Sequence, residues 1–324
     1  MCPPQHPKFM LQIQDLVVAH KRIRDYVLWT PVMTSSTIDK MTNCQVFFKC
    51  ENFQRVGAFK FRGAFNTVSQ LTEEERNRGV IAHSSGNHAQ ALALAASILG
   101  INATIVMPKN SPKIKVDATR GYGAEIVFCE NTTESRVQVA NELIEKHNYV
   151  LIHPYNDERI IAGAGTAALE LIEEVEELDY MYAPVGGGGL LSGTSIATKG
   201  CCPQARVIGV EPENADDAFR SFRDGKIYPS INPNTIADGL RTQLGDVTFQ
   251  IIRQYVDTIV TVSEEEIVNA MKLLWERMKM VVEPSGAVSL AGLIKMKDEL
   301  QDKRVGVIIS GGNIDLSDFF SRLL

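Results

Sequence analysis

Four consecutive glycines, Gly186 to Gly189, directly follow an apolar run that ends at Val185. Backbone without Cβ atoms can approach an anion closely, and its successive N–H groups can point into one concavity. The following stretch, Leu191 to Lys199, has a helical pattern, and a helix N-terminus adds the positive end of its dipole. The alternative is a surface linker, but an apolar residue, Leu190, follows at once. The run predicts an anion cradle and matches neither the dinucleotide motif G-x-G-x-x-G nor a Walker loop.

Lys60 lies between two phenylalanines, Phe59 and Phe61. In an apolar setting an ammonium group loses its proton more easily, which is the condition for a lysine that forms a Schiff base. The same pattern is also typical of a surface lysine on an amphipathic stretch. Taken alone, these three residues do not assign chemistry to Lys60.

Two further polar groups have a structural and a chemical interpretation. Ser85 and Asn87 lie in a turn that opens a predicted helix, where serine and asparagine are also common caps. Glu211 ends a predicted strand, and Asp216 and Asp217 follow closely. Carboxylates with free carbonyls at this spacing can hold a hard cation such as Mg²⁺ or Ca²⁺. A helix start that carries aspartate for the macrodipole is, on these residues alone, the better-supported interpretation.

The elements that must position these residues alternate along the whole chain. Short β-branched runs predict strands at Val46–Cys50, Gly79–Ala82, Ala103–Met107, Glu125–Cys129, Val150–His153, Tyr180–Val185, Val207–Glu211, Thr258–Val262 and Val305–Ser310. Their continuous apolar character indicates strands covered on both faces, as in parallel sheets. Predicted helices include Asn87–Leu99, Glu134–Lys146 and Ala167–Glu176, and capping boxes begin at Thr72 and Ser263. This alternation predicts a doubly wound α/β protein.

Ligands of such sheets bind outside the carboxyl ends of the strands. Three polar turns that contain glycine follow predicted strands, at Ser84–His88, Gly186–Gly189 and Ser310–Asn313. Each turn alone is compatible with an ordinary βα connection. Together they predict one large ligand site.

Composition narrows the class of protein. The 324 residues are 44% hydrophobic and include 39 acidic and 33 basic residues, for a formal charge of −6. This length favours two domains or one large α/β domain. There is no basic block or basic-aromatic interleaving, so we expect no nucleic-acid partner. No apolar stretch is long enough to span a bilayer and the N-terminus lacks an apolar signal core, so we expect a cytoplasmic protein.

The cysteines also favour a cytoplasmic protein, and the histidines indicate no zinc site. Six cysteines, at positions 2, 44, 50, 129, 201 and 202, form no Cys-x-x-Cys pair. We therefore expect reduced thiols, as in the cytosol. The six histidines include no pair at zinc-binding spacing.

Taken together, the motifs resemble the fold-type II pyridoxal-phosphate enzymes of the serine/threonine dehydratase and serine racemase group. The matching stretches are Glu51–Gln54, Gly57–Asn66, His83–Gln90, Ile161–Thr166, Gly186–Gly193, Glu211–Asp217, Thr235–Gly239, Glu283–Gly286 and Ser310–Leu316. They span nearly the entire chain in the family's order, so the resemblance is highly specific. It implies the tryptophan synthase beta-like fold, with a large domain (residues 1–76 and 157–324) and a small domain (residues 77–156).

The resemblance also implies roles for individual residues. Lys60 matches the lysine that forms the Schiff base with the pyridoxal carbonyl, and the backbone amides of Gly186, Gly187, Gly188, Gly189 and Leu190 match the 5′-phosphate site. Asn87 matches the partner of the ring hydroxyl, and Ser310 the residue that faces the pyridine nitrogen. Ser85, Asn87, His88 and Arg136 lie where the family binds the substrate carboxylate. In racemases this region also places a second base, which here would be Ser85.

Two features favour the racemases within this group. Ser85 resembles racemases, whereas many dedicated threonine dehydratases have alanine there; hydroxyaspartate dehydratases, however, also have serine. The run from Glu211 to Asp217 resembles the racemase metal site, with Glu211, Asp217 and the Ala215 carbonyl as ligands of Mg²⁺ or Ca²⁺, or of Mn²⁺. One departure is Ala164, where relatives usually have glutamine.

The resemblance therefore predicts a serine racemase that also eliminates water from serine to give pyruvate and ammonia. The alternative is a dehydratase of threonine, serine or threo-3-hydroxyaspartate without significant racemisation. A different class is a cofactor-carrying protein without turnover, against which Lys60, Ser85 and the glycine run argue. The family is commonly dimeric and related animal racemases respond to nucleotides, which implies a homodimer and a nucleotide effector.

Overall fold

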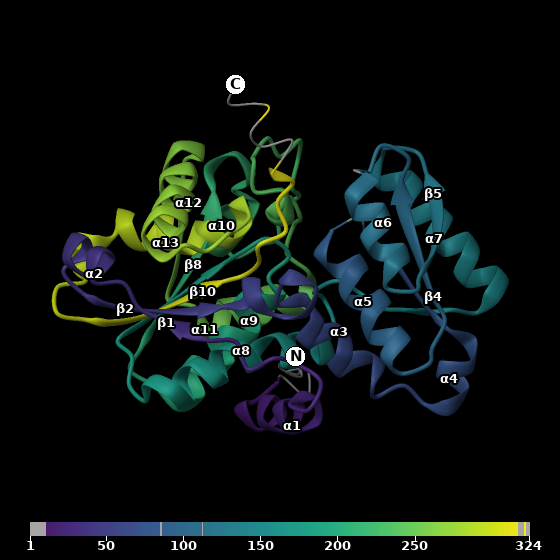
Figure 1. Ribbon diagram of the computed structural model, residues 1–324, viewed down its shortest axis with the longest axis horizontal. Helices are drawn as coiled ribbons and strands as arrows, with labels where there is room; N and C mark the ends of the chain where they lie inside the picture. The colour runs from purple at the N-terminus through teal and green to yellow at the C-terminus, as the bar shows by residue number, and fades with distance from the viewer. Residues whose placement is uncertain (1–10, 85, 112, 317–320, 322–324) are drawn as a thin grey trace, which may run out of the picture.

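The computed structural model describes residues 11–84, 86–111, 113–316 and 321. Its strands form a six-stranded sheet of order β1-β2-β10-β7-β8-β9 and a four-stranded sheet of order β5-β4-β3-β6, which lie side by side in Figure 1. The six-stranded sheet contains β1 (Val32–Met33), β2 (Gln45–Cys50), β7 (Tyr180–Pro184), β8 (Arg206–Pro212), β9 (Thr258–Val262) and β10 (Arg304–Ile309). All its neighbouring pairs are parallel except the pair of β1 with β2.

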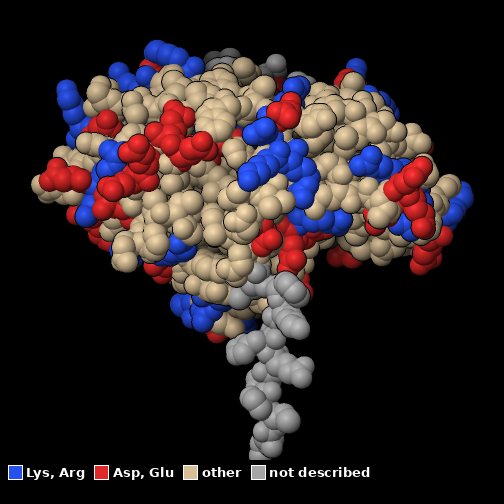
Figure 2. All heavy atoms as spheres, turned by 90° about the horizontal axis from the view of Figure 1, so that it is seen from below, with Lys and Arg blue, Asp and Glu red and all other residues tan. Residues whose placement is uncertain are grey.

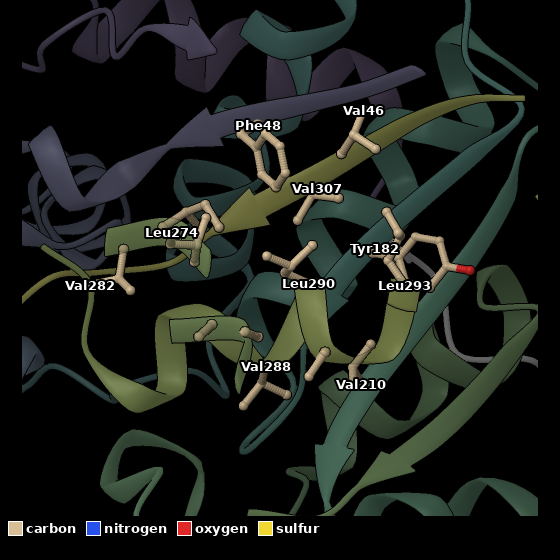
Figure 3. Packing of buried hydrophobic residues seen from close by; sticks show 14 of the residues in the cluster. Val46, Phe48, Tyr182, Val210, Leu274, Val282, Val288, Leu290, Leu293 and Val307 are labelled. Carbon is tan, nitrogen blue, oxygen red and sulfur yellow. The ribbon is translucent and has the colours of Figure 1, made fainter. Parts of the chain in front are cut away.

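Helices cover both faces of this sheet, because alternate side chains of a strand point to opposite faces. Phe48, Tyr182 and Val307 point to the face covered by helices α2, α12 and α13, as Figure 3 shows for part of this core. Met181 and Ile308 point to the other face, which α1, α8, α9 and α11 cover. The bounds are α1 (Ile13–Ile23), α2 (Ser36–Thr42), α8 (Glu158–Val175), α9 (Gly189–Cys201), α10 (Asp217–Asp224), α11 (Asp246–Tyr255), α12 (Glu264–Met278) and α13 (Pro284–Lys295).

The four-stranded sheet is wholly parallel. It contains β3 (Val80–His83), β4 (Ala103–Pro108), β5 (Glu125–Cys129) and β6 (Val150–Leu151). One core joins it to α3 (Lys60–Val68), α5 (Asn87–Ile98) and α6 (Lys113–Gly121), and a second core joins it to α7 (Thr133–His147). Between α3 and β3 lies α4 (Glu73–Arg78), and short 3₁₀ turns are η1 (Glu51–Phe53), η2 (Arg55–Gly57), η3 (Glu213–Ala215), η4 (Asp238–Leu240) and η5 (Lys297–Glu299). This sheet lies within the predicted small domain; the exact domain boundaries stay a prediction.

The predicted α/β class with two helix-covered sheets is confirmed, and so are both capping boxes. The Thr72 hydroxyl accepts a hydrogen bond from the Glu75 amide at 3.2 Å, and the Glu75 carboxylate accepts one from the Thr72 amide at 2.8 Å. Ser263 and Glu266 form the same reciprocal pair at the start of α12.

Three details of the predicted elements are wrong. The strand predicted at Val150–His153 ends at Leu151, and His153 instead accepts hydrogen bonds from the next two amides through its Nδ1. The helix predicted at Ala167–Glu176 begins earlier, at Glu158. The prediction missed its first half because the small residues there are buried but weaken the apolar pattern. The short strand β1 was not predicted, since two residues carry no periodicity.

Charged side chains lie interspersed over the face of the molecule in Figure 2. The cysteines in the described part of the chain, Cys44, Cys50, Cys129, Cys201 and Cys202, are free thiols. Within the same residues, no helix combines the length and apolar character needed to cross a membrane.

Candidate active site

The glycine run lies at the carboxyl end of β7 and leads into α9, which begins at Gly189. Gly188 has a φ of +89°, a left-handed conformation that favours glycine. A Cβ added to Gly186 would lie 2.9 Å from the Leu240 Cα atom, and one added to Gly187 would lie 2.3 Å from the Tyr155 ring. The first N–H groups of a helix have no partner within it. The run therefore fits the predicted phosphate cradle, since glycine is sterically required there and α9 offers N–H donors.

Lys60 is the first residue of α3, and its Nζ donates a hydrogen bond to the Pro154 carbonyl oxygen at 2.8 Å. Burial lowers the pKa of this amine to about 8, and the Glu283 carboxyl, where it is ionised, opposes the shift. About a tenth of the amine is therefore unprotonated at pH 7, far more than for an exposed lysine. This is the state that attacks a carbonyl group, so the environment favours Schiff-base chemistry.

Ser310 lies beside Lys60 although 250 residues separate them in the sequence. The Phe59 amide donates to the Ser310 carbonyl oxygen at 3.0 Å, and Ala58 pairs with Gly311 in an isolated β-bridge. The Ser310 side chain is buried, and its hydroxyl donates to the Ser285 carbonyl oxygen at 3.4 Å.

Asn87 is the first residue of α5, and both ends of its amide are bonded. Its Nδ2 donates to Glu283 Oε1 at 2.8 Å, and its Oδ1 accepts from Asn313 Nδ2 at 2.9 Å. Glu283 is buried, and burial, assisted by the charge of Asp238, raises the pKa of this carboxyl to about 8. The network thus places an acid, uncharged at neutral pH, next to Asn87.

Two of the remaining predicted substrate residues, His88 and Arg136, lie near the end of β3. The Nε2 atom of His88 lies 2.9 Å from the Ile152 carbonyl oxygen, and burial and the charge of Lys60 lower the pKa of the ring to about 3. The imidazole is therefore neutral and its single N–H is already donated, so only the backbone N–H of His88, in the first turn of α5, is oriented for an anion. Arg136 is half-buried on α7, and its charge adds to burial in lowering the pKa of His83. Ser85 lies outside the described residues.

The predicted cation ligands are at the carboxyl end of β8. Glu211 is buried and accepts hydrogen bonds from the amides of Ala218 and Phe219 at 3.0 and 2.8 Å. Asp217 begins α10; it is only 1% exposed, and neither carboxylate oxygen has a partner of good hydrogen-bond geometry among the described residues, although the nearby Ser230 hydroxyl acts to lower its pKa. Burial raises the pKa of Asp217 to about 6, and burial and the Asp217 charge raise the pKa of Glu211. A bound cation would favour the ionised form of both buried carboxylates. The pair therefore fits a hard cation, with the Ala215 carbonyl as a third ligand.

Side chains alone do not provide all the ligands of the predicted cation site. In the described ranges, no group of three or more His, Cys, Asp or Glu side chains is arranged to hold a metal ion. The predicted set contains two such side chains and one backbone carbonyl, so the cation remains a prediction that depends on the carbonyl and on water.

Sequence reasoning missed the segment that follows β6. Besides the Pro154 carbonyl that receives Lys60, it contains Tyr155, whose ring packs against Gly187, and Asn156, whose side chain bonds Asp246 and the Val247 amide at the start of α11. The rule that found the other turns, a polar segment at the carboxyl end of a strand, also applies here. Glu283 begins one of the stretches that resemble the family but was given no role, although a lone acid between Val282 and Pro284 is a signal for a buried role.

Comparisons with known proteins agree with the family resemblance seen in the sequence. A family model described as "pyridoxal-phosphate dependent enzyme" matches residues 23–311. An L-threo-3-hydroxyaspartate ammonia-lyase from Saccharomyces cerevisiae is 52% identical over 306 residues, which are 94% of each chain. A serine racemase from Dictyostelium discoideum is 48% identical over 98% of this chain and 99% of its own. The structure of maize serine racemase superposes with a TM-score of 0.94, at 44% identity and 97% coverage of both chains.

Proposed function

Because the chain belongs to the family of pyridoxal-phosphate dependent enzymes, we propose that it is a serine racemase that also converts serine to pyruvate and ammonia. The observation that carries this proposal is the setting of Lys60. Its amine has a pKa of about 8, donates a hydrogen bond to the Pro154 carbonyl oxygen and lies beside Ser310. The residue after Pro154, Tyr155, packs against the glycine cradle at Gly187. A reactive amine at this place is what the attachment of pyridoxal phosphate requires.

Each group that would contact the cofactor has a distinct task. The amides of Gly186 to Gly189 and Leu190 bind the phosphate, Asn87 donates to the ring hydroxyl, and Ser310 faces the pyridine nitrogen. When bound, the cofactor supplies an electron sink that acidifies the Cα–H bond of the amino acid. A hydroxyl such as that of Ser310 does not hold a proton on the pyridine nitrogen as an aspartate would. The sink is therefore moderate, which favours proton return or β-elimination over transamination.

Racemisation needs a proton donor or acceptor on each face of Cα. Lys60 serves one face and Ser85 the other. The backbone N–H of His88 and the guanidinium of Arg136 bind the substrate carboxylate, together with Ser85 and Asn87. Loss of the β-hydroxyl instead of reprotonation gives pyruvate and ammonia after hydrolysis.

The second candidate is an ammonia-lyase that acts on threo-3-hydroxyaspartate without significant racemisation. It is favoured by the 52% identity to the yeast enzyme of that activity. Both candidates use the same Lys60 and the same cradle, so the difference lies in proton return to Cα and in the substrate side chain.

The finer assignments belong to the same proposal. Glu211, Asp217 and the Ala215 carbonyl bind Mg²⁺, Ca²⁺ or Mn²⁺, supported by the buried oxygens of Asp217, which lack a partner of good hydrogen-bond geometry among the described residues. The enzyme is cytoplasmic, as its cysteine usage indicates, and the family resemblance implies a homodimer that a nucleotide modulates.

The test is incubation of the purified protein with pyridoxal phosphate, Mg²⁺ and L-serine, followed by chiral chromatography and a pyruvate assay on the same sample. We expect D-serine together with pyruvate. Pyruvate without D-serine would favour the ammonia-lyase, with threo-3-hydroxyaspartate as the next substrate. Both candidates would be contradicted if L-serine gave neither D-serine nor pyruvate and threo-3-hydroxyaspartate gave neither oxaloacetate nor ammonia.

The variant Ser85→Ala separates the two proton-transfer faces. We expect D-serine formation to fall far more than elimination of L-serine, because elimination can begin from the Lys60 face. An equal loss of both activities, or no loss, would remove Ser85 as the second base.

A further inference from the structure

A hydrogen-bonded network of three side chains, Asn87, Glu283 and Asn313, connects the segments that contain the predicted cofactor residues. Glu283 directly precedes α13, Asn87 begins α5 and Asn313 follows β10. Asn87 and Glu283 are 196 positions apart in the sequence, and Asn87 Nδ2 donates a hydrogen bond to Glu283 Oε1 at 2.8 Å. The network therefore couples the four-stranded unit to the six-stranded unit at the site itself.

The network leaves little freedom to the Asn87 amide. Its Oδ1 accepts from Asn313 Nδ2, so its oxygen cannot exchange places with its nitrogen without losing two bonds. One Nδ2 hydrogen is committed to Glu283, which leaves the other for a ligand. The orientation of Asn87 is thus set by an acceptor on one side and a donor on the other.

Asn313 and Glu283 are themselves tightly enclosed. Asn313 Nδ2 also donates to the Val56 carbonyl oxygen at 2.6 Å, which places it directly before the segment of Lys60. A Cβ added to Gly57 would lie 2.5 Å from Asn313 Oδ1, and one added to Gly311 would lie 2.5 Å from Glu283 Oε1. A side chain at either position would displace these oxygens, so glycine lets the backbone lie directly against the network.

Charged groups surround Glu283 on several elements. Asp238 of η4 acts with burial to raise the pKa of Glu283, and Lys115 of α6 lowers it, as does the backbone N–H of Asn313. Lys115 and Asp238 also pair with each other at 2.8 Å. Lys60 of α3 faces the same carboxyl, since the Glu283 charge acts on the pKa of its amine. At neutral pH the balance keeps Glu283 protonated.

We propose that Glu283 is a positioning residue for the cofactor: its carboxyl accepts one N–H of the Asn87 amide and so orients Asn87, whose remaining N–H then meets the ring hydroxyl. This inference rests on the proposed function and adds to it a residue and a protonation state. Ionisation of Glu283 would bring a negative charge beside the electron-rich hydroxyl and weaken cofactor binding.

The first test measures the dissociation constant of pyridoxal phosphate by titrating the cofactor-free protein at pH 7. Glu283→Gln keeps an uncharged acceptor of the same length, so we expect an affinity within about twofold of the unmodified protein. Glu283→Asp is too short to reach Asn87, so we expect about fivefold weaker binding, the size of one neutral hydrogen bond. In an Asn87→Ala background the aspartate substitution should have no further effect; the same fivefold loss there would overturn the proposal.

The second test repeats the titration from pH 6.5 to 9.5 and takes the ratio of the dissociation constants of the unmodified protein and Glu283→Gln. Glu283→Gln also removes the charge that raises the pKa of Lys60, so this pKa is measured in both proteins from the pH dependence of cofactor attachment, and its contribution is subtracted from the ratio. We expect the ratio to rise through about pH 8. Asp238→Asn should move this rise to lower pH and Lys115→Met to higher pH, which a merely structural role of Glu283 would not produce. A ratio that stays constant with pH would overturn the proposal.

The outcomes distinguish this inference from the function on which it rests. A protein that binds no pyridoxal phosphate, or binds it without turnover of any tested amino acid, contradicts the proposed function. A protein that binds it and makes D-serine, but shows a constant ratio, retains its function and contradicts only the role of Glu283.

Discussion

At the scale of single residues, Lys60 owes its predicted reactivity to its surroundings more than to its own chemistry. An exposed lysine has a pKa near 10.5, and here burial lowers it to about 8 while Glu283 limits the shift. The Pro154 carbonyl holds the amine in place without adding charge.

This setting predicts how fast pyridoxal phosphate attaches to the cofactor-free protein at different pH. Because the pKa of Lys60 is lowered, the neutral amine accumulates as pH rises towards about 8 and is the dominant form above it. We expect the rate, followed by absorbance of the bound cofactor, to rise between pH 6.5 and 8.5 and then level off. A rate that still rises steeply at pH 10 would indicate an ordinary lysine, and Lys60→Ala should give no bound-cofactor absorbance.

At the scale of elements, glycines set how closely the helices behind the site approach. A Cβ added to Gly193 of α9 would lie 2.5 Å from the Gly165 amide nitrogen of α8, and one added to Gly163 would lie 2.7 Å from the Gly63 Cα of α3. The helices that begin with the cradle and with Lys60 are therefore both packed on α8. The neighbouring Ala164, which departs from the family pattern, is also buried at 1% exposure.

Gly193→Ala tests this packing. Alanine normally favours a helix over glycine by up to about 1 kcal/mol, so a stabilising effect is the expectation from propensity alone. Here we expect destabilisation by about 1–3 kcal/mol, measured by urea unfolding, because the methyl group overpacks the crossing. Gly121→Ala on α6, where an added Cβ meets nothing within 4 Å, is the matched control and should not destabilise.

Arg62 connects two elements next to the site by buried ion pairs. It bonds both oxygens of Glu51 at 2.7 and 2.8 Å and both oxygens of Glu170, on α8, at 2.6 and 2.7 Å. All three side chains are at most 1% exposed. The pairs hold the first turn of α3, from which Lys60 extends, against α8.

Arg62→Met leaves Glu51 without its cation while Glu170 keeps Lys49 at 2.8 Å. We expect a loss of about 3–5 kcal/mol in unfolding free energy, since the cost of an uncompensated buried charge exceeds the gain from apolar packing. Lys272→Met, which removes an exposed pair with Glu276, should cost at most about 0.5 kcal/mol. Equal effects of the two substitutions would contradict this account of Arg62.

At the scale of the whole molecule, a bound cation would stabilise the folded chain. The carboxylates of Glu211 and Asp217 come together only when β8 and α10 are in place, so the unfolded chain offers no such site. Ligands that bind only the native state raise the unfolding free energy by mass action.

We therefore expect Mg²⁺ at a hundred times its dissociation constant to stabilise the protein by about 2.7 kcal/mol in thermal or urea unfolding. Asp217→Asn should abolish this response, because it removes the charge of a ligand. Asp216→Asn, next in sequence but paired with Arg220 on the surface, should leave it intact. An unchanged response in Asp217→Asn would refute the cation site.

The sequence alone determined the features that are local along the chain. The glycine run followed by a helix, the two capping boxes and the apolar strands depend on neighbours within a few residues, and the structure has each of them. The family was also readable from the sequence, and the matches to a family model and to full-length relatives confirm it.

Only the tertiary structure decided which groups meet. Glu283 contacts Asn87 across 196 residues, and Pro154 receives Lys60 across 94, so no spacing in the sequence indicates either contact. The early start of α8 was hidden for the same reason, because its small residues are explained by helices that pack on them. Short-range pattern sets secondary structure, whereas burial and the charge of distant neighbours set the pKa values of Lys60 and Glu283, and these exist only once the chain has folded.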